Sequence, residues 1–102
     1  MMHKSLKQLA GILRSKFDKE LRQIFFFGSR ARGDASPESD YDCLLVFRIV
    51  TPEIRKDLDR ISSEWLLDSG MVFSWIALTE ADLERLRYEP FLQNAIREGI
   101  AA

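Results

Sequence analysis

The amino-acid sequence predicts an α/β domain, in which a small mixed β-sheet is flanked by helices. Segments with the apolar spacing of helices separate short apolar segments typical of buried strands, which is the order expected of an α/β layer. The chain has 102 residues, of which 46% are hydrophobic, so it can bury one core. We therefore expect a single domain over residues 1–102.

The predicted elements follow from local patterns. In residues 5–17, Leu6, Leu9 and Leu13 recur at intervals of three and four, which places them on one face of a helix. Between the first two strands, turn residues surround a short Arg-Ala-Arg segment that is expected to be helical. Strands are predicted at 23–27, 41–50 and 71–78, and further helices at 52–69 and 80–98. The predicted order is α-β-α-β-α-β-α.

Helix boundaries are marked by particular residues. Thr51 supplies a hydroxyl cap, and Pro52 is suited to the first helical position. Gly70 is expected to end that helix. Pro90 lacks an amide hydrogen, so it should interrupt the last helical segment, and Gly99 should stop it.

The C-terminal stretch is more apolar than one helix on a small domain requires. Two interpretations stay open, because these residues could close the core under the sheet or form a protein-binding surface. The residues concerned are Phe91, Leu92, Ala95, Ile96 and Ile100.

Composition excludes several classes of protein. The formal net charge is −1, without the basic excess of a duplex-binding domain, so there is no direct DNA-binding signature. A single cysteine, Cys43, cannot form an internal disulfide and fits a reducing compartment. The longest apolar runs are too short to cross a membrane, and the first residues show no secretory signal. We expect a soluble cytoplasmic protein.

Chemistry is concentrated between residues 28 and 42. Gly28 and Ser29 follow a predicted strand and precede the short helix, where unpaired backbone amides favour an anion. Glycine allows a phosphate to approach the backbone closely, and the serine hydroxyl is a further donor. Arg30 and Arg32 follow, and guanidinium groups match phosphate oxygens in a forked geometry. These four residues form a candidate phosphate-binding turn.

Two acidic residues, Asp40 and Asp42, begin the next predicted strand. Period-two alternation puts both carboxylates on one face, separated by roughly 6–7 Å along the strand. Two carboxylates at this spacing can bind one or two Mg²⁺ ions, which nucleotide phosphates would also bind. Cys43 should face away from this site and belong to the core.

This segment resembles the signature of the minimal nucleotidyltransferase domains of the DNA polymerase β-like superfamily. The shared features are Gly28-Ser29, a gap of ten residues, and Asp40-Tyr41-Asp42. The resemblance implies the polymerase β-like nucleotidyltransferase fold, with Gly28 and Ser29 holding the triphosphate of ATP or another NTP. It also implies that Asp40 and Asp42 are catalytic and coordinate Mg²⁺. The implied reaction transfers a nucleoside monophosphate to a hydroxyl and releases pyrophosphate.

The same resemblance implies a partner protein. Several small members of this family are the antitoxins of toxin–antitoxin pairs with a HEPN-type ribonuclease toxin, and some of them add AMP to a tyrosine of that toxin. The short chain leaves no room for a separate acceptor-binding domain, which also favours an acceptor supplied by a partner.

One feature of the family pattern is missing. Enzymes of the superfamily typically carry a third carboxylate on the next core strand, but residues 71–78 contain no acid, and Ser74 is the polar residue near their middle. Asp68 and Glu80 flank the strand and would have to reach the site from its ends. The favoured hypothesis is an active, AMP-transferring enzyme, and the alternative is a weakened or inactive module that acts by covering a partner protein.

Overall fold

The computed structural model describes residues 4–27 and 41–102. The elements, in chain order, are α1 (Lys4–Phe17), the 3-10 helix η1 (Asp18–Glu20), β1 (Leu21–Phe27), β2 (Tyr41–Phe47), α3 (Pro52–Ser69), β3 (Phe73–Thr79), α4 (Glu80–Arg85), α5 (Pro90–Glu98) and β4 (Ile100–Ala101). The short helix expected near Arg30 lies outside the described residues.

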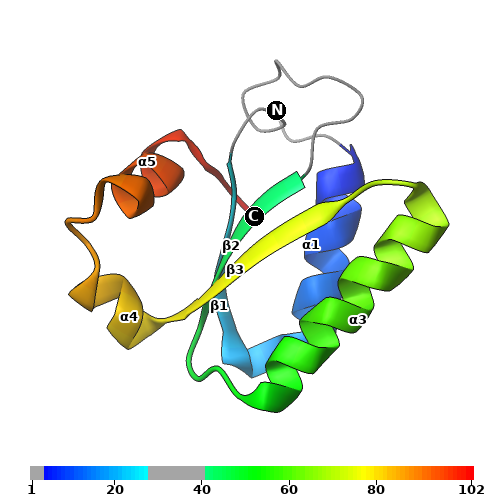
Figure 1. Cartoon of the computed structure of the whole chain (residues 1–102), viewed down its shortest axis with the longest axis horizontal. Helices are drawn as coiled ribbons and strands as arrows, with labels where there is room; N and C mark the ends of the chain where they lie inside the picture. The colour runs from blue at the N-terminus through cyan, green and yellow to red at the C-terminus, as the bar shows by residue number, and fades with distance from the viewer. Residues whose placement is uncertain (1–3, 28–40) are drawn as a thin grey trace.

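The strands of this part of the chain form one mixed sheet in the order β3-β2-β1-β4 (Figure 1). β2 runs antiparallel to β1 and parallel to β3, while β4 pairs antiparallel with the outer side of β1. The parallel pair is connected through α3, because parallel neighbours need a crossover that returns the chain to the same end of the sheet. The predicted α/β class with a small mixed sheet is thus confirmed.

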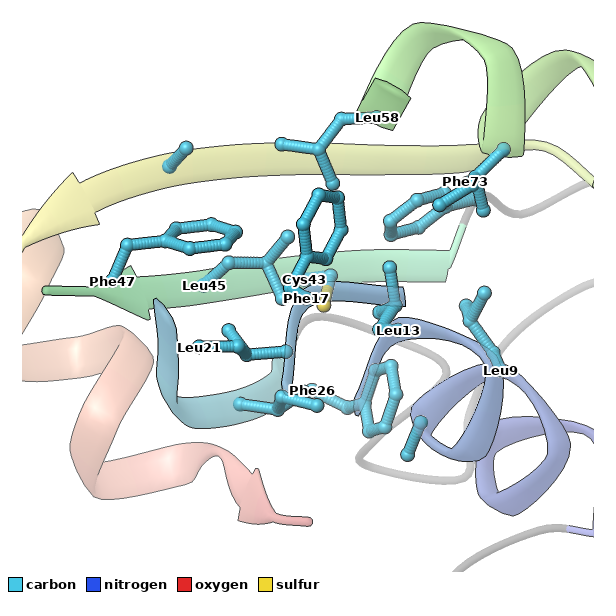
Figure 2. Close-up of a cluster of buried hydrophobic side chains, with 14 of the residues drawn as sticks. Leu9, Leu13, Phe17, Leu21, Phe26, Cys43, Leu45, Phe47, Leu58 and Phe73 are labelled. Atoms are coloured by element: carbon cyan, nitrogen blue, oxygen red, sulfur yellow. The ribbon is translucent and has the colours of Figure 1, made fainter. Parts of the chain in front are cut away.

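Helices cover both faces of the sheet. α1 and α3 lie on one side, and α4 and α5 lie on the other (Figure 1). The larger core lies under α1 and α3, where Phe17 packs edge-to-face against Phe47 with ring centroids 5.2 Å apart. Figure 2 shows side chains from α1, α3 and the strands that converge in this core, including Leu9, Leu13, Phe26, Cys43, Leu45, Phe47 and Leu58.

The predicted caps of the helix after β2 are present. The Thr51 hydroxyl accepts a hydrogen bond from the Ile54 amide at 3.1 Å, and Pro52 occupies the first helical position. Gly70 ends the helix in the left-handed conformation, with φ 73°, and its amide donates to the Leu66 carbonyl.

The second apolar face is smaller. Leu44 of β2 packs with Leu92 and Ala95 of α5, which are buried at one-turn spacing. Phe91 and Ile96 are 52% and 37% exposed. The C-terminal stretch therefore divides between the two interpretations, because part of it closes the core and part of it remains on the surface.

The structure corrects three strand boundaries and adds one strand. β1 begins at Leu21 rather than Gln23. β2 ends at Phe47 rather than Val50, because Arg48 and Ile49 turn out to solvent although the apolar pattern continues. β3 begins at Phe73 rather than Met71. The strand β4 is missing from the prediction, since two residues are too short for an alternation to be recognised.

The interruption at Pro90 is confirmed, because α4 ends at Arg85 and α5 begins at the proline. Gly99 does follow the last helical residue, but in an extended conformation rather than a left-handed one. No described helix is long and apolar enough to span a membrane.

Candidate functional site

Three residues form a row across one end of the sheet. Asp42 at the start of β2 is the register partner of Phe27 at the end of β1 and of Ser74 at the start of β3. Register partners on neighbouring strands carry their side chains on the same face of a sheet, so the three side chains lie side by side. We call them the Phe27–Asp42–Ser74 row. The predicted phosphate-binding turn follows Phe27 directly in the sequence.

The row lies on the face that α4 and α5 cover. Asp42 alternates with Cys43 and shares its face with Leu44, which packs against α5. Cys43 belongs to the opposite, larger core with α1 and α3. The expectation that Cys43 faces away from Asp42 and belongs to the core is therefore confirmed.

Asp42 and Cys43 also differ in burial, which affects the pKa of the Cys43 thiol. Asp42 is half-buried, whereas Cys43 is completely buried. Burial raises the pKa of the Cys43 thiol well above its ordinary value, and the nearby negative charge of Asp42 raises it further. The thiol stays protonated, so Cys43 is a core residue and not a nucleophile.

Most of the predicted site cannot be placed relative to the row. Of the predicted residues, Asp42 is described, while Gly28, Ser29, Arg30, Arg32 and Asp40 lie outside the described residues. Their proximity to one another and to Asp42 stays a prediction.

The register does show what stands beside Asp42 on the next strand. That residue is Ser74, a hydroxyl and not a carboxylate. Glu80 follows the far end of β3, roughly 20 Å along the strand from Ser74, and its carboxylate lies 3.4 Å from the Arg22 guanidinium. Asp68 is exposed near the end of α3. Within residues 4–27 and 41–102, no three acidic, histidine or cysteine side chains cluster as a metal site.

An aromatic residue of the apolar C-terminal stretch also adjoins the row, a contact that the sequence did not predict. Phe91 of α5 contacts Phe27 edge-to-face, with ring centroids 5.7 Å apart and an interplanar angle of 82°. The sequence indicates the place of Phe91 only through its position beside Leu92 and Ala95. A residue next to a buried stripe lies at the edge of the buried face of a helix.

Comparison with known proteins places this geometry in context. The family model described as a nucleotidyltransferase domain matches residues 6–100. A protein of Methanocaldococcus jannaschii, provisionally named a protein adenylyltransferase, is 31% identical over 99 residues, which cover 94% of this chain and 92% of that protein.

Solved structures show the same fold. A crystal structure of a provisionally named nucleotidyltransferase from Sulfolobus solfataricus is 31% identical and has a TM-score of 0.55, over 82% of this chain and 72% of that chain. A mutant MntA–HpeT toxin–antitoxin structure has a TM-score of 0.65 at 17% identity, over 95% of this chain and 70% of that one. A toxin–antitoxin structure with AMP-PNP has a TM-score of 0.60 at 15% identity, over 93% and 70%.

Proposed function

Because this chain belongs to the nucleotidyltransferase domain family, we propose that it transfers AMP from ATP to a hydroxyl on a partner protein. The observation that carries the proposal is the position of Asp42, half-buried at the start of a central strand and directly across from the last residue of β1. The candidate phosphate-binding turn joins these two strands in the sequence. The proposal therefore assigns the carboxylate of Asp42 and the expected anion-binding amides of that turn to one site.

Each predicted residue has a role in this proposal. Gly28 and Ser29 bind the triphosphate through backbone amides and a hydroxyl, and Arg30 and Arg32 neutralise its oxygens. Asp40 and Asp42 provide the hard oxygen donors that suit Mg²⁺, and a half-buried carboxylate at a strand start fits that use. When bound, Mg²⁺ neutralises phosphate charge and helps to orient the nucleotide.

The reaction itself needs no covalent group from the protein. An acceptor hydroxyl oxygen forms a bond to the α-phosphorus, and the bond from that phosphorus to the pyrophosphate oxygen breaks. Pyrophosphate leaves with the electron pair, and the hydroxyl proton passes to solvent. Positioning and charge neutralisation therefore supply most of the catalysis.

The acceptor is expected on another protein. The relative from M. jannaschii is named for protein adenylyltransfer, and fold neighbours come from toxin–antitoxin structures. Together with the sequence resemblance, this supports an antitoxin whose partner is a HEPN-type toxin. The single cysteine is buried and protonated, which fits the reducing cytoplasm.

A second function is favoured by one observation. Ser74 stands beside Asp42 where a third carboxylate would complete the metal site of the superfamily. In this alternative the chain keeps the fold, can still bind a nucleotide, transfers AMP poorly or not at all, and acts by covering its partner protein.

The first testable prediction concerns the two aspartates. In the double variant Asp40→Asn with Asp42→Asn, we expect loss of AMP transfer by about a hundredfold or more with the fold intact, because both carboxylates that would hold Mg²⁺ are removed. The assay follows labelled AMP from ATP onto a co-expressed partner protein, in the presence of Mg²⁺. Circular dichroism checks the fold.

Asp59→Asn is the matched control, because Asp59 is exposed on α3, which covers the opposite face of the sheet from the row. Normal transfer by the double variant would show that the metal assignment is wrong. ATP binding by the unaltered chain without any transfer would favour the covering module.

A further inference from the structure

An exposed aromatic ring adjoins the end of the sheet that carries Asp42. Phe91 is 52% exposed, although its edge-to-face contact with Phe27 holds the ring in place. Phe27 is the register partner of Asp42, and such partners have Cα atoms about 4.5–5.5 Å apart. The Phe91 ring thus lies on the order of 10 Å from the Asp42 backbone, on the same face of the sheet.

The packing of α5 explains why this ring is available. Leu92 and Ala95 form the buried stripe of the helix and attach it to Leu44. Phe91 precedes that stripe in the first helical turn, directly after Pro90, so it lies at the rim of the helix rather than beneath it. A large aromatic side chain that is half-exposed at a candidate site contributes less to the core than Leu92 does, and one side of it remains accessible.

We propose that Phe91 is the stacking surface for the base of the bound nucleotide. This inference rests on the proposed function, because it requires the triphosphate to lie over Asp42 and the turn that begins at Gly28. In this proposal the base extends away from the phosphates along the face of the sheet, toward β1. On the β1 side of Asp42, Phe27 and, in contact with it, Phe91 offer aromatic rings to the base. The separation is comparable to that between the phosphates and the base of a nucleotide.

A stacking role also predicts which ligands Phe91 can distinguish. Every base has a π-face, so an aromatic platform binds bases without reading their hydrogen-bonding edges. Phe91 therefore contributes affinity for a nucleoside triphosphate over inorganic triphosphate, and it contributes little to the choice of base.

The experiment compares two ligands and several variants of the full chain. We measure equilibrium binding of ATP and of inorganic tripolyphosphate, each with Mg²⁺. Phe91→Ala should weaken ATP binding by about fivefold or more, because a base–aromatic stack is lost. Tripolyphosphate binding should be unchanged, because that ligand has no base. Phe91→Trp should retain ATP binding.

Two further variants make the result specific. Phe91→Leu keeps an apolar contact with Phe27 but lacks the flat ring, so it should also weaken ATP binding while the fold is retained. Tyr88→Ala is the matched control, since Tyr88 is 74% exposed just before α5 and contacts the Arg87 guanidinium rather than Phe27. It should leave both affinities unchanged.

The outcomes separate this inference from the proposed function. If the unaltered chain binds and transfers AMP but Phe91→Ala and Phe91→Leu bind ATP normally, the stacking role is wrong and the function stands. Equal weakening of ATP and tripolyphosphate would also overturn it. Normal ATP binding with reduced modification of the partner would assign Phe91 to partner docking instead. If the unaltered chain binds no nucleotide, the proposed function fails and the stacking role fails with it.

Discussion

Position 74 on β3 lies beside the Asp42 carboxylate and affects what this end of the sheet can bind. Ser74 is the parallel-strand partner of Asp42, so a side chain at position 74 lies beside the Asp42 carboxylate on the same face. A serine there provides a hydroxyl but no negative charge. The residue beside Asp42 therefore determines how many carboxylates this end of the sheet can offer to a cation.

This proximity leads to a prediction for Ser74→Asp. A second carboxylate about 5 Å from Asp42 would be repelled by about 1 kcal/mol in water and by more near the protein surface. We expect a lower melting temperature in EDTA and a recovery with Mg²⁺, measured by thermal unfolding. Under the proposed function, the same variant should also raise the transfer rate.

Ser74→Asn has a similar size to Ser74→Asp and no charge, so it serves as the control. If the two variants unfold at the same temperature in EDTA and respond equally to Mg²⁺, position 74 does not lie beside Asp42 in the manner described.

At the scale of elements, helix ends are set by their terminal residues. Thr79 and Asp82 form a reciprocal capping box at the start of α4, with hydrogen bonds of 3.0 and 3.2 Å. A hydrogen bond from the Arg85 guanidinium, followed by these contacts with Thr79, lowers the pKa of the Asp82 carboxyl. At the C-terminal end of α3, Gly70 has a positive φ, which a residue with a side chain adopts only at an energetic cost.

Two glycine substitutions should therefore act in opposite directions. Gly70→Ala should lower the free energy of unfolding by about 1 kcal/mol, because alanine is strained at φ 73°. Gly11→Ala should raise it by about 0.5–1 kcal/mol, because the site is inside α1 and an added Cβ has no atom within 4 Å. Urea unfolding curves measure both changes. Equal effects of the two substitutions would contradict the assigned conformations.

At the scale of the whole molecule, hydrogen bonds hold the last residue, Ala102, against α1 and β1. The Ala102 amide donates to the Ile24 carbonyl at 2.9 Å, and the Arg14 guanidinium donates to the Ala102 carbonyl. β4 thus covers part of the outer edge of β1 and links α5 to the sheet. The turn into β4 is made by Gly99, which lies against the backbone of α5 and of β1.

Gly99→Ala should loosen this closure. An added Cβ would overlap the Ala95 carbonyl oxygen and come within 3.3 Å of the Phe26 carbonyl oxygen, so backbone has to move. We expect a loss of about 1–3 kcal/mol in the free energy of unfolding. Hydrogen exchange should be faster at the Ala102 amide, whose bond to Ile24 depends on the position of β4. Unchanged exchange and an unchanged urea midpoint would show that the edge tolerates the side chain.

Much of the fold could be predicted from local patterns. Leu6, Leu9 and Leu13 are buried on one face of α1, as their spacing indicates, and Thr51 and Gly70 bound α3 as predicted. The opposite faces of Asp42 and Cys43 follow from strand alternation. The end of β2 could not be predicted from Ile49 and Val50, because apolar residues continue after the strand has lost its hydrogen-bonding partners.

The sequence by itself determined the helices and longer strands that the structure describes, the caps of α3, the residue types of the candidate nucleotide site, and the family signature between Gly28 and Asp42. These depend on residues that are neighbours along the chain. Only the tertiary structure decided that Ser74 stands beside Asp42, that Phe91 reaches Phe27, and that β4 pairs with β1. Those contacts depend on strand order and register, which result from the packing of distant segments around a shared core and leave no local pattern in the sequence.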